Sequence, residues 1–250
     1  MKMKTLAICN QKGGVGKSTI TCHFGFRLLE DAKRSLLIEL DTQRNVSKTL
    51  APYVCETGAG ALFSANPIDL PANGELTVIA ADGRLLDIEH QPPQVMGHFR
   101  NHLASLRDRY DYCVIDCAPA LGWKMSAALM SADFVLAPIE MAQWSLDGVK
   151  ELLKTVFGIK QKYNEKLVFL GLLVNRLNAH DRLQKQNLVN LMRNFGQFAL
   201  PVKVAQKQAI PEALLDHMPV WRLRKTAARD AAKDMRALLD LVLGKIGDTE

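Results

Sequence analysis

One short segment near the N-terminus constrains the fold more than any other part of the chain. It reads Gln11-Lys12-Gly13-Gly14-Val15-Gly16-Lys17-Ser18. Apart from Gln11, it matches the pattern G-x-x-x-x-G-K-[ST], in which a glycine-rich loop joins a strand to a helix and its backbone N–H groups surround phosphate oxygens. An apolar stretch, Thr5–Cys9, precedes the loop, and Ser18–Asp31 has apolar residues at helical spacing. The segment therefore predicts a phosphate-binding loop between a buried strand and an amphipathic helix.

Each residue type in this loop suits the binding of a nucleoside triphosphate. Lys17 is expected to reach the β- and γ-phosphates, and the Ser18 hydroxyl to bind Mg²⁺. The helix that begins near Lys17 adds the positive end of its dipole to the site. We therefore predict ATP and Mg²⁺ as cofactors. The residues expected to contact the nucleotide are Gly13, Gly14, Val15, Gly16, Lys17, Ser18 and Thr19.

Apolar runs alternate with helical segments along the rest of the chain. The runs expected to form buried strands are Thr5–Cys9, Ser35–Leu40, Thr77–Ala80, Tyr112–Ile115, Phe134–Ile139 and Val168–Val174. Helical spacing recurs between and after them, as in Leu146–Phe157 and Arg182–Asn194. This alternation predicts an α/β fold with one doubly wound, mostly parallel sheet flanked by helices. A chain of 250 residues fits a single P-loop domain, residues 1–250, in which Gly83–Gly97 is an irregular excursion.

Two acidic residues follow predicted strands and extend the candidate site. Asp41 comes after Ser35–Leu40, and Asp116 comes after Tyr112–Ile115. Ligands of doubly wound sheets bind at the carboxyl ends of the strands, so both acids are expected to face the nucleotide. Asp116 is predicted to hold Mg²⁺, through water, and Asp41 to position the attacking water.

The lysine at the second loop position points to a particular family. Lys12 followed by Gly13-Gly14 resembles the deviant Walker A motif K-G-G-x-G-K-[ST] of the ParA/MinD superfamily. The resemblance continues in two longer segments. They are Glu39-Leu40-Asp41-Thr42-Gln43-Arg44-Asn45, similar to D-x-D-P-Q-G-N, and Tyr110–Gly122, similar to Y-D-x-x-x-I-D-x-P-P-S-L-G.

The resemblance implies an ATPase in which two subunits enclose two ATP molecules. Lys12 would then act on the partner's nucleotide, and Lys12, Lys17 and Asp41 would be the catalytic residues. Asn175 and Arg176 resemble the strand end that contacts the base. The resemblance to ParA-type members implies a homodimer that forms with ATP and binds DNA without sequence specificity. Its ATP hydrolysis would be slow, and a ParB-type centromere-binding protein would stimulate hydrolysis and so release the protein from DNA.

Some positions depart from the family pattern. Thr42, Arg44 and Ala118 replace a proline, a glycine and a proline in loops that sense the γ-phosphate in the family, so the hydrolysis rate stays open. Val204–Lys207 stands where the family has I-P-R-N along the adenine pocket, which leaves the base contacts there unassigned.

The charge distribution fits the ParA-type branch. The net charge is +6, and residues 160–236 contain 15 Lys or Arg against 6 Asp or Glu. A basic surface of this kind binds phosphates in a salt-sensitive, sequence-tolerant manner. The candidate DNA-binding residues are Lys203, Lys207, Arg222, Arg224, Lys225 and Arg229.

Two other functions stay open on the sequence alone. A MinD-like ATPase that works on a membrane surface would use the amphipathic segment Ala231–Ile246, but its polar face mixes acids and bases, which favours packing on the protein's own sheet. A metabolic ATP-dependent ligase on the same fold would need a small-molecule pocket.

Cys113 and Cys117 could ligate a cluster, although buried free thiols are favoured.

The remaining expectations concern the ends and the location of the chain. No apolar run approaches the roughly 18 residues that span a bilayer, and the polar face of Ala231–Ile246 is mixed in charge, so no membrane partner is expected. The predicted location is cytoplasmic and nucleoid-associated. The chain starts at its first predicted strand, so we expect no N-terminal helix-turn-helix extension and no sequence-specific repression by this chain alone.

Overall fold

Seven strands form one sheet in the computed structural model, which describes residues 2–71 and 74–247. The strands are β1 (Lys4–Ile8), β2 (Ser35–Glu39), β3 (Leu76–Ile79), β4 (Tyr112–Asp116), β5 (Phe134–Glu140), β6 (Val168–Leu177) and β7 (Ala199–Ala205). Their spatial order is β3-β2-β4-β1-β5-β6-β7, and every described pair is parallel. The predicted α/β fold with a doubly wound parallel sheet is confirmed, and β1 lies at its centre.

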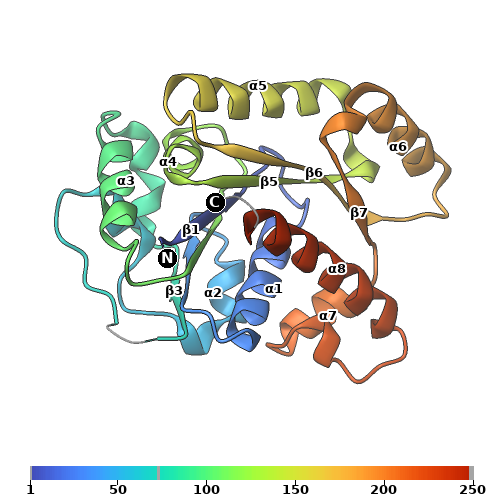
Figure 1. The fold of residues 1–250 in the computed structure, drawn as a ribbon, viewed down its shortest axis with the longest axis horizontal. Coiled ribbons are helices and arrows are strands. Elements are labelled where there is room, and N and C mark those ends of the chain that lie inside the picture. The colour runs from blue at the N-terminus through green and yellow to red at the C-terminus, as the bar shows by residue number, and fades with distance from the viewer. Residues whose placement is uncertain (1, 72–73, 248–250) are drawn as a thin grey trace.

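Helices cover both faces of this sheet (Figure 1). They are α1 (Lys17–Glu30), α2 (Asn45–Thr49), α3 (Val95–Ser105), α4 (Trp123–Ser131), α5 (Leu146–Lys162), α6 (Arg182–Phe195), α7 (Ala209–Leu215) and α8 (Ala228–Gly247). One hydrophobic core contains side chains of α3, α4, α5 and α6, and the other contains side chains of α1, α2, α7 and α8. Each sheet face therefore has its own core, which is why the strands are apolar on both sides.

Short 3₁₀ turns complete the backbone. They are Ala51–Tyr53, Ala59–Phe63, Gly83–Leu86, Ile88–His90, Met141–Gln143, Gly196–Phe198 and Val220–Arg222. The predicted irregular excursion at Gly83–Gly97 consists of two of these turns and the start of α3.

The amphipathic C-terminal segment is α8, and it packs as predicted on the protein's own sheet. Five large apolar side chains along one face of α8 are at most 1% exposed, and they share a core with residues of β1, β4 and β6. They are Met235, Leu238, Leu239, Val242 and Ile246. Burial of each such side chain contributes about 1.5–3 kcal/mol, so exposing this face to a membrane would cost much of the domain's stability. Within the described residues, no helix is both long and apolar enough to cross a bilayer.

Candidate nucleotide-binding site

The glycine-rich loop lies at the carboxyl end of the central strand and is braced by the end of β6. Gly14 and Gly16 have φ values of 79° and 93°, a left-handed conformation that favours glycine. Asn175 donates from Nδ2 to the Val15 carbonyl at 2.8 Å, and a Cβ on Gly16 would lie 2.2 Å from the same nitrogen. Arg176 donates to the Gly14 carbonyl at 2.9 Å. The loop conformation thus depends on residues more than 150 positions away.

Lys17 lies beneath the loop and is only 5% exposed. Its Nζ donates to the Lys12 carbonyl at 3.0 Å. Burial lowers the pKa of this ammonium, and the nearby Asp116 carboxylate acts in the opposite direction. A buried cation with one neutral acceptor is poorly compensated, so a phosphate oxygen is a better partner for it than the carbonyl.

Asp116 and Ser18 form the candidate metal site. The Ser18 hydroxyl donates to Asp116 Oδ2 at 2.7 Å. The other carboxylate oxygen, Oδ1, is buried and has no hydrogen-bond partner among the described residues. Burial raises the pKa of Asp116 to about 7, against the Ser18 hydrogen bond and the Lys17 charge. An orphaned carboxylate oxygen beside a hydroxyl is the donor set that a hard cation prefers, so these residues fit Mg²⁺, held directly or through water.

Asp41 and Glu39 are two residues apart but face different surroundings. Asp41 lines a cleft of about 430 Å³ together with Lys17 and Ser18, and its Oδ1 accepts from the Gln43 amide at 3.0 Å. Glu39 is fully buried and accepts from the Val46 amide at 2.7 Å, at the N-terminus of α2. Of the two acids in this motif, only Asp41 reaches the phosphate side.

A second cleft shares Gly14, Gly16 and Thr19 with the first. It measures about 240 Å³, and its lining includes Gly14, Thr19, Asn175, Arg176, Ala205, Gln206, Lys207 and Pro211. The predicted base contacts Asn175 and Arg176 are thus brought beside the loop. The cleft adds Gln206 and Lys207, which the sequence pattern left without a role at the base. Their position follows from β7, a strand that the sequence analysis did not predict.

Lys12 does not line the phosphate cleft, which is the 430 Å³ cleft that contains Lys17, Ser18 and Asp41. Its side chain is exposed and donates to the carbonyl of Gln143, in the turn that follows β5. Its backbone amide donates to Asn10 Oδ1 at 2.9 Å. The two lysines of the motif therefore occupy different environments, with Lys17 under the loop and Lys12 on its outer side.

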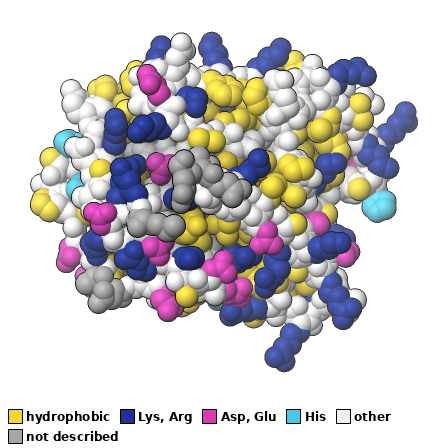
Figure 2. All heavy atoms as spheres, viewed as in Figure 1, with side chains coloured by type: hydrophobic (Ala, Val, Ile, Leu, Met, Phe, Trp, Pro, Cys, Tyr) yellow, Lys and Arg dark blue, Asp and Glu magenta, His cyan; other side chains and the backbone are white. Residues whose placement is uncertain are grey.

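The predicted DNA-binding residues fall into two groups. Three form ion pairs: Arg222 with Glu30 at 2.8 Å, Lys207 with Asp230 at 3.6 Å, and Lys225 with Glu212. Lys203, Arg224 and Arg229 are exposed, and none of them forms an ion pair with a described residue. Figure 2 shows Lys and Arg side chains along the edge where α7 and α8 lie in Figure 1, with some acidic side chains among them.

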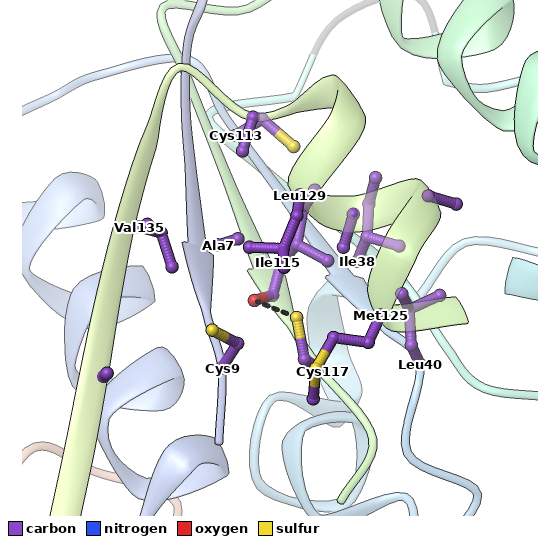
Figure 3. Close-up of a cluster of buried hydrophobic side chains, with 14 of the residues drawn as sticks. Ala7, Cys9, Ile38, Leu40, Cys113, Ile115, Cys117, Met125, Leu129 and Val135 are labelled. Atoms are coloured by element: carbon purple, nitrogen blue, oxygen red, sulfur yellow. Dashed lines mark hydrogen bonds between the residues drawn. The ribbon is translucent and has the colours of Figure 1, made fainter. Parts of the chain in front are cut away.

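The cysteines near the site belong to the hydrophobic core. Cys9, Cys113 and Cys117 lie among Ile115, Met125 and neighbouring apolar side chains (Figure 3). They are free and buried, and burial raises the pKa of the Cys113 thiol above its ordinary value. Among the described residues, no group of three or more His, Cys, Asp or Glu side chains is placed to hold a metal ion. The buried-thiol interpretation is confirmed.

Comparison with known proteins agrees with this geometry. Residues 3–169 match the model of the AAA domain family. The chain is 40% identical to Protein IncC of Escherichia coli over 251 residues, covering 98% of this chain and 70% of IncC. It is 29% identical to the sporulation initiation inhibitor protein Soj of Bacillus subtilis over 227 residues, covering 87% of this chain and 90% of Soj.

Solved structures show the same fold at lower identity. A plasmid partition protein from Borrelia burgdorferi superimposes with a TM-score of 0.74 at 21% identity, covering 98% of this chain and all of that one. Cobyrinic acid a,c-diamide synthase from Mycobacterium smegmatis, solved with bound ADP and magnesium, gives 0.77 at 24% identity, covering 99% of this chain and 97% of that one. With the deviant loop, its strand-end acids and these relatives in agreement, the chain belongs to the ParA/MinD superfamily of P-loop ATPases, in the Soj-like branch.

Proposed function

We propose that this protein is a ParA-type DNA partition ATPase, in which ATP binding forms a homodimer and the dimer binds DNA without sequence specificity. The observation that carries the proposal is the separation of the two loop lysines. Lys17 is buried at the phosphate cleft, whereas Lys12 is exposed on the outer side of the loop, where a second subunit can approach. The similarity to IncC and Soj supports the same assignment.

The site residues have distinct roles in this proposal. Lys17 and the loop amides bind the β- and γ-phosphates, Ser18 and Asp116 hold Mg²⁺, and Asp41 positions the attacking water. The base lies in the cleft beside Asn175 and Arg176. Lys12 offsets phosphate charge on the partner's nucleotide, where charge builds up in the transition state.

DNA binding is assigned to the basic residues that follow β6. Lys203, Arg224 and Arg229 lack intramolecular ion pairs among the described residues, so their charge is available for phosphates. A dimer presents this surface twice, which multiplies the number of phosphate contacts. ATP can therefore control DNA affinity without a change in the surface itself. A ParB-type partner would stimulate the slow hydrolysis and release the dimer.

Binding to a random-sequence DNA duplex tests this proposal. The full chain is titrated at moderate salt with Mg-ATP, with Mg-ADP and without nucleotide. We expect salt-sensitive binding with Mg-ATP alone, and its loss in Lys17→Ala. Equal binding in all three conditions, or none, contradicts a nucleotide-controlled DNA-binding protein. Sedimentation with anionic vesicles in the presence of ATP would instead favour the MinD-like alternative.

A further inference from the structure

We propose that Trp221, Arg222 and Arg236 form a phosphate-binding position for DNA, and that Glu30 occupies this position as an internal counter-ion. The inference rests on the proposed DNA-binding function and deepens it. Neither Trp221 nor Arg236 belongs to the DNA-binding residues predicted from the sequence, and Glu30 gives the site a regulator of its own.

The contacts of the Glu30 carboxylate define the position. The Trp221 indole nitrogen donates to Oε1 and to Oε2 at 3.0 Å each. Arg222 lies at 2.9 Å from Oε1 through Nε and at 2.8 Å through its terminal nitrogen. The Arg236 guanidinium lies 3.6 Å from Oε2 and stacks on the Trp221 ring at 4.8 Å from its centroid. Three donors from two elements thus converge on one anionic group.

This arrangement suits a phosphodiester as well as a carboxylate. Guanidinium groups bind both anions with the same paired geometry, and an indole N–H adds a donor that carries no charge. The donors reach solvent, since the side chains of Arg222 and Arg236 are 63% and 46% exposed, whereas that of Glu30 is 22% exposed. An ion pair with exposed partners is weak in water, so a DNA backbone that makes several contacts at once can displace the carboxylate.

The helix that carries Glu30 also carries the nucleotide-binding lysine. Lys17 is the first residue of α1 and Glu30 is the last, about 20 Å apart along the axis. In the middle of the same helix, His23 accepts a hydrogen bond from the Val220 amide at 3.3 Å, next to Trp221. Both the counter-ion and the backbone of its donors are therefore anchored to the helix that begins at the phosphate loop.

Glu30→Gln tests the counter-ion role because it removes the charge but keeps the shape and an acceptor for Trp221. We expect its Kd for duplex DNA with Mg-ATP to fall by about two- to fivefold, the range of a weak exposed ion pair. The slope of log K against log salt should become steeper by about 1 for each arginine released. Asp31→Asn is the matched control, since it makes the same charge change at the next residue, whose partner is Arg27.

The position itself is tested by Arg236→Ala in the Glu30→Gln background, which should weaken DNA binding and make the salt slope shallower by about 1. If Glu30→Gln and Asp31→Asn change DNA affinity equally, the counter-ion role is overturned while DNA binding stands. If none of the proteins binds DNA with Mg-ATP, the proposed function fails as well. Thermal melting of each variant distinguishes the loss of a contact from the loss of folding. If Glu30→Gln gains affinity for anionic vesicles but not for DNA, the assignment of DNA phosphate as the ligand is overturned.

Discussion

Arg44 adopts a backbone conformation that its side chain disfavours. It precedes α2 with φ 58° and ψ 37°, in the loop that carries Asp41. A non-glycine residue in this region costs about 1–2 kcal/mol because Cβ crowds the following carbonyl oxygen. Arg44→Gly relieves this strain, but glycine also adds chain entropy to the unfolded state, which offsets part of the gain. We therefore predict that the substitution raises the free energy of unfolding by a net amount of up to about 1 kcal/mol, as measured by urea denaturation.

The control for this prediction is Arg44→Ala, which removes the guanidinium but keeps Cβ. If strain is the cause, the alanine variant shows no comparable gain in stability. Equal gains in both variants would instead place the cost in the arginine side chain. Strained residues concentrate at functional sites, so the ATPase rates of both variants report whether the conformation serves the Asp41 loop.

At the scale of single residues, the sequence is most informative where the chemistry is local. The loop from Gly13 to Ser18 is a continuous motif, so its residues can be proposed together as one site, and Lys17 and Ser18 line the same cleft. The hydrogen bond from Asn175 to the Val15 carbonyl and the contacts of Glu30 with Trp221 both join residues separated by more than 150 positions. No spacing rule covers such pairs, because the fold alone brings them together.

Among the elements, α1 contains a buried histidine that ties it to the segment before α8. His23 is fully buried, its Nδ1 bonds to the Thr19 carbonyl at 2.7 Å, and Nε2 accepts from Val220. Burial lowers the pKa of His23 to about 4, so the folded protein binds this proton less well than the unfolded chain. The stability that this neutral ring provides is complete above about pH 6.5 and is lost as the pH falls towards 4.

This linkage predicts a difference between His23→Gln and the wild type. When the pH falls from 7 to 5, the titration of His23 lowers the free energy of unfolding of the wild type by about 2 kcal/mol. The variant lacks this contribution. The variant should be less stable at pH 7, because the ring and its hydrogen bonds are lost, and its stability should fall less on acidification. Urea unfolding at both pH values measures the effect, and parallel pH profiles would show that the ring titrates normally.

Elements with a strong hydrophobic pattern were predicted well, and elements without one were missed. Six predicted strands correspond to β1 to β6, with shifts of a few residues at their ends. The strand β7 was missed because Ala199–Ala205 contains Pro201, alternates in burial and pairs with β6 in an irregular register at the sheet edge. The segments of α3 and α4 gave no helix prediction, although both pack into the core beside each other.

On the scale of the whole molecule, the sheet gathers at one edge what the sequence spreads over the chain. The phosphate loop follows β1, Asp41 follows β2, Asp116 ends β4 and Asn175 lies near the end of β6. Because all described strand pairs are parallel, their carboxyl ends meet at the same edge, beside the central strand where the strand order reverses. This edge leaves Lys12 exposed, and the proposed dimer would bring a second molecule against it.

The oligomeric state of the protein tests this role of Lys12. In the presence of Mg-ATP, we expect the wild type to form a dimer and Lys12→Ala to stay monomeric while it still binds ATP, because Lys17 and the loop amides are untouched. Lys17→Ala should lose ATP binding and the dimer together. Asp41→Ala is the matched control. If Asp41 acts only on the attacking water, this variant should dimerise with Mg-ATP and its dimer should persist. Sedimentation velocity measures the states, and a Lys12→Ala protein that dimerises like the wild type would show that this lysine does not act across the interface.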